Sequence, residues 1–326
     1  MKNLNIEILR GVLMIWIILF HYTTRYNELF EKIYPFEFDN GGIVGVTFFF
    51  IISGYFFYSG IIRSKKLSVI NVGKFCINKY WRLYPAYLIS ITLIFLVYHF
   101  IDLPGRECSL RDFLVNCIFI YHPYFSYVDS AHWFIATLIK MQFISAFFLL
   151  LKPSIRSHSI LLFELFIFGL LIYSTHSTIP LVHQIVFIFS PDCFLKFLVG
   201  YNIYMILSQQ SKKKYLHAVL GILITGYYCA TIHLVLILLY TIITYWTLQN
   251  KHIFTVNPCN PLVIVGKYSF AWYLIHQNIG FAIIKQLNTL GMNNELWLLV
   301  PITITFGIAV TIQNITNLLP RKLFNK

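Results

Sequence analysis

The chain has 326 residues, of which 58% are hydrophobic, 18% aromatic and only 11% charged, and its mean hydropathy is +0.71. Soluble domains carry about 25% charged and about 45–50% apolar residues, so this composition excludes an ordinary water-soluble enzyme, a disordered protein and a secreted disulfide scaffold. The formal net charge is +13, but charges this sparse do not form a surface that tracks nucleic-acid phosphates. We therefore expect an all-α integral membrane protein with no nucleic-acid partner.

The cysteines and the N-terminus exclude two further classes. None of the six cysteines lies in a CxxC pair, and no Cys/His cluster has the spacing of a zinc site, so we expect no metal. Glu7, Arg10 and His21 interrupt the first apolar stretch, and no small-residue cleavage site follows it. We expect this stretch to remain as the first membrane helix rather than to act as a signal peptide.

Apolar stretches of about 20 residues predict membrane-spanning helices. They fall at 7–25, 42–62, 83–101, 133–151, 159–174, 190–207, 215–231, 233–249, 267–286 and 296–318. The prediction is a polytopic bundle of about ten helices, forming a single transmembrane domain over residues 1–326 with no appended soluble domain. Residues 110–128 are also apolar, but a span there would invert the topology downstream, so we predict an external amphipathic or re-entrant segment.

Lysine and arginine gather in short segments that fall on one side of such a bundle. They follow the second, fourth and sixth predicted helices and close the chain: Arg63, Lys65, Lys66, Lys74, Lys79 and Arg82; Lys152 and Arg156; Lys212, Lys213 and Lys214; Arg321, Lys322 and Lys326. Cytoplasmic loops carry an excess of these residues, so we expect this side, and both termini, to be cytoplasmic.

The first predicted helix carries two ionisable groups inside an apolar stretch, where such groups are functional candidates. Arg10 and His21 are eleven residues apart, which is three helical turns plus about 20°, so they share one face about 16 Å apart along the axis. Arginine can clamp phosphate, and histidine can take and return a proton near neutral pH. The alternative is a snorkelling arginine and a histidine that only packs.

Two cations also mark the third predicted helix, in the segment KYWRLYPAY at 79–87. Lys79 and Arg82 are three residues apart and face the same way, and we expect Pro85 in the first turn of the helix. Such an entrance can bind phosphate groups, or it can be a positive-inside anchor. In the second helix, Gly45, Ser53 and Gly54 predict close helix packing.

Three further segments predict local structure. His132, Trp133 and Phe134 open the fourth helix on the external face, where an aromatic belt would also explain the tryptophan. The segment 266–276 opens the ninth helix and places His276 about 15 Å along it, inside the bundle. Ser190 and Pro191 predict a helix start near 190, and Asp192 and Lys196 are spaced to pair.

Together these motifs resemble the acyltransferase family 3 membrane proteins over nearly the whole chain. The pattern of Arg, ten residues and His is matched by Arg10 and His21. The other matches are Gly45, Val46, Phe48, Phe49, Ser53, Gly54 and Tyr55; Arg82, Pro85 and Tyr87; Trp133, Phe134 and Ile135; Gly266, Ser269, Phe270, Tyr273, Leu274 and His276. Lys79 stands where the family usually has Arg and lacks its bidentate fork, and the Glu-Glu pattern of some members is missing.

The resemblance implies an O-acyltransferase of the bacterial cytoplasmic (inner) membrane. Such a protein transfers an acyl group, usually acetyl, from cytoplasmic acyl-CoA to a hydroxyl of a surface glycan or its lipid-linked precursor, as in O-antigen, capsule or exopolysaccharide biosynthesis. Acetyl-CoA is then the donor substrate, with membrane lipids and the saccharide as partners.

The resemblance also implies a set of site residues. His21 acts as general base or transient acyl carrier, and Arg10 is the second catalytic residue. The acyl-CoA site is implied at Arg10, Lys79, Arg82, Ser53 and Tyr55, and the acceptor region at His132, Trp133, Tyr273 and His276.

Two other functions are compatible with the residues alone. A transporter or flippase for a lipid-linked saccharide would also use intramembrane Arg and His in an aromatic-rich bundle. A scaffold for glycan assembly would explain the surface but not the aligned Arg10 and His21.

Overall fold

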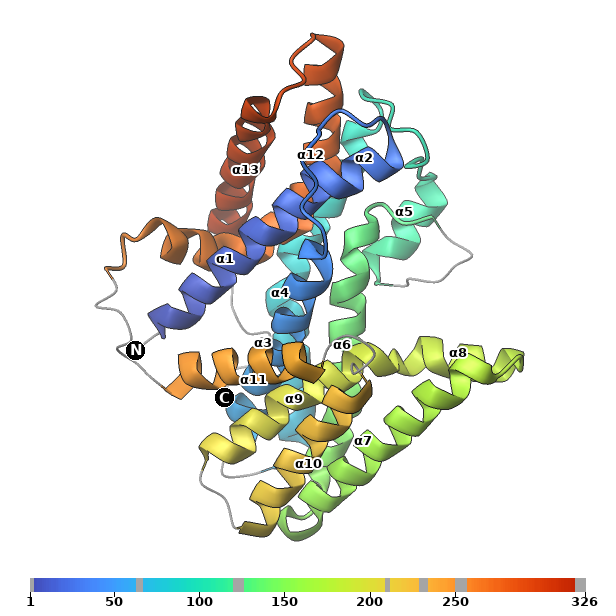
Figure 1. The fold of residues 1–326 in the computed structure, drawn as a ribbon, viewed down its shortest axis with the longest axis vertical. Helices are drawn as coiled ribbons and strands as arrows, with labels where there is room; N and C mark the ends of the chain where they lie inside the picture. The colour runs from blue at the N-terminus through green and yellow to red at the C-terminus, as the bar shows by residue number, and fades with distance from the viewer. Residues whose placement is uncertain are drawn as a thin grey trace. The chain divides into compact units, whose positions relative to one another are not determined.

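The computed structural model describes residues 3–62, 67–119, 126–208, 212–228, 234–249 and 257–319, and within them the chain forms helices and no β-strand (Figure 1). The helices in order are α1 (Leu4–Phe20), α2 (Tyr26–Leu29), α3 (Gly41–Ile62), α4 (Val69–Val97), α5 (Leu110–Cys117), α6 (Trp133–Leu150), α7 (Pro153–His176), α8 (Pro180–Phe189), α9 (Pro191–Leu207), α10 (Lys212–Tyr228), α11 (Leu234–Gln249), α12 (Pro261–Thr289) and α13 (Leu299–Asn317). Short π and 3-10 turns are η1 (His21–Arg25), η2 (Ser130–His132) and η4 (Glu295–Leu298).

Seven helical stretches of the described residues are long and apolar enough to cross a membrane. They are Leu4–Leu29, Gly41–Ile62, Val69–Val97, Ser130–Leu150, Ser154–His176, Pro180–Leu207 and Glu295–Asn317. Large apolar side chains are exposed on them, such as Phe147 at 64% and Leu162 at 66%, which requires an apolar solvent. The protein is therefore a multi-pass membrane protein.

The remaining predicted spans differ from these seven. At 215–231 and 233–249 the described helices α10 and α11 have 17 and 16 residues, and residues 229–233 lie outside the described part. Helix α12 has 29 residues, but polar side chains lower its hydropathy. The predicted count of about ten spans and the cytoplasmic position of the termini therefore stay predictions. Several of the predicted cytoplasmic cations also lie outside the described residues: Arg63, Lys65, Lys66, Arg321, Lys322 and Lys326.

Contacts divide the chain into two units, each built from separate segments. Unit 1 comprises Met1–Val46, Asn78–Ala136 and Phe254–Lys326, and unit 2 comprises Thr47–Ile77 and Thr137–Ile253.

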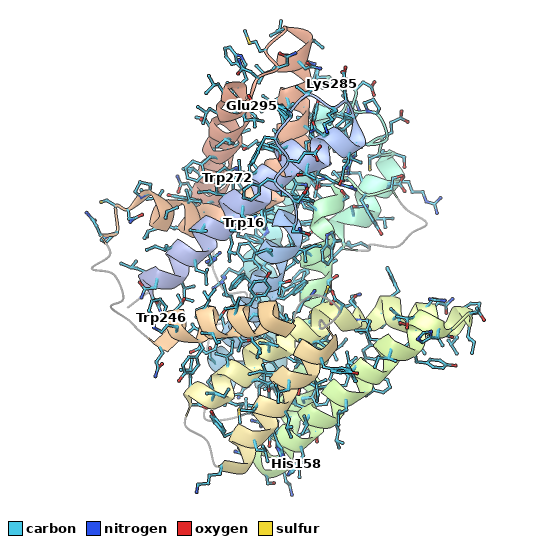
Figure 2. All side chains as sticks on the ribbon, in the orientation of Figure 1. Trp16, His158, Trp246, Trp272, Lys285 and Glu295 are labelled. Atoms are coloured by element: carbon cyan, nitrogen blue, oxygen red, sulfur yellow. The ribbon has the colours of Figure 1, made fainter. Side chains whose placement is uncertain are left out.

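In unit 1, α1 and α12 run side by side in the same direction (Figure 1). Glycines allow the backbones to touch: a Cβ atom on Gly266 would overlap the carbonyl oxygen of Glu7, and one on Gly11 would overlap that of Leu262. Helix α13 covers α12, where the indole N–H of Trp272 donates to Thr305 Oγ1 at 2.9 Å (Figure 2). The predicted close approach at Gly45 is confirmed, because its hydrogen faces the Ile17 side chain of α1 without room for a Cβ.

In unit 2, α3 packs against α9 through another glycine contact. A Cβ on Gly54 would overlap the carbonyl oxygen of Phe197, which confirms the predicted close packing there. On α7 the buried carboxyl of Glu164 accepts a hydrogen bond from Asn202 Nδ2 of α9 at 2.8 Å. Gly221 of α10 leaves the space that these two side chains fill.

The predicted start of the third helix is wrong. Helix α4 begins at Val69, so Lys79, Arg82 and Pro85 lie inside it rather than at its entrance. Hydropathy locates the start of a membrane span at the last charged residue before the apolar stretch. The α-helix itself can begin earlier, because its backbone hydrogen bonds continue through polar residues. Proline removes one N–H donor, and a membrane helix accommodates this locally.

Three other predicted helix starts, those of α9, α6 and α12, differ in how well the structure agrees with them. Helix α9 begins at Pro191 and carries the predicted pair, with Lys196 Nζ 2.8 Å from Asp192 Oδ2. Ser190 does not cap it with its side chain: its φ is 44°, and its hydroxyl donates to the Phe187 carbonyl oxygen at 3.3 Å. Helix α6 begins at Trp133 as predicted, whereas α12 begins at Pro261, five residues before Gly266.

The segment 110–128 contains the eight-residue helix α5, which is too short to cross a bilayer. Residues 120–125 lie outside the described part.

Candidate functional site

The backbone of the first span changes at His21. Helix α1 ends at Phe20, and His21–Arg25 form one turn of π-helix before α2. Such single π turns are uncommon and concentrate at functional sites. The turn places His21 half-buried, with Nδ1 shielded from solvent and without a hydrogen-bond partner.

A second histidine lies against the first. The imidazole rings of His21 and His276 are 4.9 Å apart between centroids, in an edge-to-face arrangement. His276 is fully buried on α12, which confirms the prediction that it lies inside the bundle. The sequence separates these residues by most of the chain, and the pairing of α1 with α12 brings them together.

The protonation of His276 follows from its hydrogen bond. Its Nδ1 lies 2.7 Å from the carbonyl oxygen of Tyr273. A carbonyl oxygen only accepts, so Nδ1 carries the proton and Nε2 holds a lone pair. That Nε2 is buried and has no hydrogen-bond partner.

Tyr22 fixes the two helices at this level. Its buried hydroxyl donates to the carbonyl oxygen of His276 at 2.9 Å and lies 3.2 Å from Thr305 Oγ1. Gly280 is the residue that makes room, because a Cβ there would overlap the Tyr22 ring. The residue beside His21 is thus bonded to the backbone of His276.

A polar network holds the other side of α12 to the segment before α6. The carboxylate of Asp129, which is 1% exposed, accepts from the backbone N–H of Ala131 at 2.8 Å and from Gln277 Nε2 at 3.3 Å. Arg106 donates to Ser130 Oγ at 2.7 Å and to Gln277 Oε1 at 3.2 Å. The guanidinium of Arg106 also lies 6.0 Å from the centre of the Phe281 ring, which borders His21. A cation is therefore held close to the two imidazoles.

His132 belongs to the same unit and is fully buried. Its Nε2 donates to the carbonyl oxygen of Leu274 at 2.6 Å, which leaves Nδ1 as a buried lone pair without a partner. The Tyr273 hydroxyl donates to the carbonyl oxygen of Ala131. His132 and Tyr273, two of the four residues of the predicted acceptor region, therefore hold α12 to η2. In the part of the chain that the structure describes, no three His, Cys, Asp or Glu residues are placed to hold a metal ion.

Cationic side chains also lie at the other end of α1 and on α4. Arg10 Nη1 lies 3.3 Å from Glu7 Oε2, and Arg82 of α4 is close enough to repel Arg10 electrostatically. Arg82 is exposed and Lys79 is half-buried. Neighbouring guanidinium groups favour the binding of an anion.

Comparison of the chain with models of protein families gives a match that covers nearly the whole chain. A family model described as an acyltransferase domain matches residues 3–312. The chain belongs to the acyltransferase 3 family. No curated protein and no solved structure matches it. The match covers both the His21 and His276 pair and the Arg10 and Arg82 pair of this acyltransferase.

The remaining predicted site residues of the acyltransferase are Ser53, Tyr55 and Trp133. Ser53 and Tyr55 belong to unit 2, where the Tyr55 ring contacts that of Tyr204 at 6.2 Å. Trp133 is 39% exposed, whereas His132 and Tyr273 are buried in the network described above. The structure thus brings together His21, His276, His132 and Tyr273 in unit 1, and separately Arg10 and Arg82.

Cys108 is not suited to act as a nucleophile. Cys108 lies two residues after Arg106, outside the candidate spans, and burial raises the pKa of its thiol to about 11. The reactive form of cysteine is the thiolate, so Cys108 is a protonated thiol at neutral pH.

Sequence reasoning missed the residues that support the histidines of the acyltransferase. Tyr22, Gly280, Arg106, Asp129 and Gln277 are common residue types without a recognisable spacing. The only signal available was the pair of charged residues Arg106 and Asp129 in the segment between two predicted spans.

Proposed function

We propose that this acyltransferase moves an acetyl group from acetyl-CoA to a hydroxyl of a surface glycan or of its lipid-linked precursor, with His21 as the catalytic residue. The observation that supports it best is the half-buried imidazole of His21, placed by a π turn beside a cluster of buried, unpaired imidazole nitrogens. A histidine near neutral pH can take the proton of an attacking hydroxyl and return it to the leaving group.

The donor site follows from charge. Coenzyme A is a large polyanion, and Arg10 and Arg82 form a cationic pair in the same unit as His21. The residues Arg10 and His21 are about 16 Å apart along the helix axis at 1.5 Å per residue, so an extended donor bound at the cations reaches the imidazole with its thioester. Lys79 adds a further cation on α4.

The reaction proceeds by attack of the acceptor oxygen on the thioester carbonyl carbon. The acceptor proton passes to His21, the carbon–sulfur bond breaks, and the coenzyme A thiolate takes that proton. Arg106, held close to the imidazoles by Ser130 and Gln277, is placed to stabilise negative charge on the carbonyl oxygen. A transient acyl-imidazole on His21 would use the same residues in two steps.

The topology completes the proposal. The lysine and arginine clusters favour a cytoplasmic position for the termini, so the donor enters from the cytoplasm and the acceptor from the other side of the bacterial inner membrane.

The test uses a strain in which the gene is deleted and replaced by variants. We expect His21→Ala to abolish O-acetylation of the surface polysaccharide, measured by NMR, while the variant still accumulates in the membrane. His176→Ala, which changes an exposed histidine at the end of α7, is the matched control and should leave acetylation unchanged. Full acetylation by His21→Ala would contradict the proposal.

A further inference from the structure

We infer that His276 is a positioning residue for His21: its Nε2 lone pair accepts the His21 Nδ1–H during acyl transfer and so fixes the tautomer in which His21 Nε2 is the base. This inference rests on the proposed function and goes beyond it, because it assigns a role to a residue that does not touch substrate.

The tautomer of His276 determines which of its ring nitrogens carries the lone pair. Since Nδ1–H of His276 donates to the Tyr273 carbonyl oxygen at 2.7 Å, the other ring nitrogen can only accept. This nitrogen is buried and has no hydrogen-bond partner, and its ring is packed edge-to-face on the ring of His21.

His21 also has a ring nitrogen without a hydrogen-bond partner. Its Nδ1 is buried without a partner, and a buried polar nitrogen left unpaired destabilises the folded protein. A hydrogen bond from His21 Nδ1–H to His276 Nε2 removes both unpaired atoms at once. Catalytic hydrogen bonds are often long in structures without substrate and tighten in the complex, which fits rings in contact at 4.9 Å between centroids.

His276 is itself held in place by hydrogen bonds. Its carbonyl oxygen accepts from Tyr22, the neighbour of His21, and the next residue, Gln277, is bonded to Asp129 and Arg106. An imidazole fixed in this way keeps a constant orientation towards His21, as the third group of a catalytic triad does for its histidine.

The proton balance is complete with these groups. The acceptor O–H proton moves to His21 Nε2 as the new C–O bond forms, giving an imidazolium whose Nδ1–H is held by His276. When the C–S bond breaks, the thiolate takes the proton from Nε2, and His21 returns to the starting tautomer. His276 gains and loses no proton.

Two substitutions at His276 separate this role from a structural one. In His276→Asn the amide nitrogen can replace Nδ1 and keep the bond to the Tyr273 carbonyl, but nothing reaches His21. In His276→Gln the amide oxygen can replace Nε2 and accept from His21, while the bond to Tyr273 is lost. We expect His276→Asn to lower kcat by about 10- to 100-fold with an unchanged KM for acetyl-CoA, and His276→Gln to retain more activity.

The assay uses the purified full chain in nanodiscs, radiolabelled acetyl-CoA, and a polysaccharide fraction from cells that lack the protein. The inference would be overturned if His276→Gln were no more active than His276→Asn, or if the substitutions changed only KM. The His21→Ala variant separates this inference from the proposed function. If His21→Ala is inactive but His276→Asn is more active than His276→Gln, only the role of His276 is wrong. If His21→Ala is active, the proposed function is wrong.

A measurement on the unchanged protein covers the case in which both variants misfold. Nitrogen-15 NMR of histidine-labelled protein in lipid, with the His21 signal assigned from His21→Gln, reports the tautomer directly. We expect the proton of His21 on Nδ1, and a proton on Nε2 would overturn the inference.

Discussion

The hydroxyl of Tyr22 donates a hydrogen bond to the backbone carbonyl oxygen of His276 at 2.9 Å, and these two residues are 254 positions apart in the chain. This bond joins the residue next to His21 to the backbone of its partner histidine. The relative position of the two imidazoles therefore depends on α1 and α12 as a pair rather than on either helix alone.

Removal of this hydroxyl should loosen the site. In Tyr22→Phe the ring still fills the space at Gly280, but His276 and Thr305 lose a hydrogen-bonding partner. We expect the free energy of unfolding to fall by about 0.5–1.5 kcal/mol and kcat to fall with KM unchanged. Thermal unfolding and acetyl-transfer kinetics measure both, and Tyr173→Phe, at a residue 54% exposed on α7, serves as control. An unchanged melting temperature in Tyr22→Phe would argue against this bond.

The glycine contact between α1 and α12 should tolerate no side chain. Gly266→Ala would place a methyl group on the carbonyl oxygen of Glu7, so the helices must separate, and we expect a loss of at least about 1–3 kcal/mol. Gly307→Ala on α13 is the matched control, since no atom lies within 4 Å of its Cβ position. Thermal unfolding in detergent should show a clear loss for Gly266→Ala alone. Equal melting temperatures for the two variants would contradict the described packing.

The cation pair should govern donor binding. Arg82→Glu places a carboxylate beside Arg10, and we expect acetyl-CoA affinity to fall at least about tenfold, which corresponds to about 1.4 kcal/mol. Isothermal calorimetry with acetyl-CoA measures the change. Lys32→Glu makes the same change in net charge at a side chain that is 68% exposed in the loop after α2, and it should bind normally. Normal binding by Arg82→Glu would remove Arg82 from the donor site.

The buried carboxyl of unit 2 should matter for stability and not for chemistry. Glu164→Ala leaves Asn202 Nδ2 without its acceptor at 2.8 Å, which costs about 1–3 kcal/mol. Glu164→Gln keeps an acceptor oxygen, and its free energy of unfolding should differ by no more than about 1 kcal/mol from that of the original protein. Both variants should retain kcat at a temperature where they are folded. A loss of kcat in folded Glu164→Gln would give this carboxyl a role in the reaction.

The sequence alone was sufficient for the class of protein and for its family. Composition and apolar stretches predict a helical membrane protein because a bilayer selects for length and hydropathy, which are local properties. The motif residues Arg10 and His21 share a helix, so their spacing follows from helical geometry.

Only the tertiary structure decided which distant groups meet. The pairing of His21 with His276 arises because Gly11 and Gly266 let α1 approach α12 at backbone distance. Gly280 leaves room for the Tyr22 ring, whose hydroxyl supports His276. Periodicity and hydropathy describe one helix at a time and hold no information about which faces pack together. The same limit explains the wrong start of the third helix: the transition from apolar to polar residues marks an expected membrane boundary, whereas the backbone of α4 continues from Val69 through Pro85 because helical hydrogen bonding is independent of that boundary.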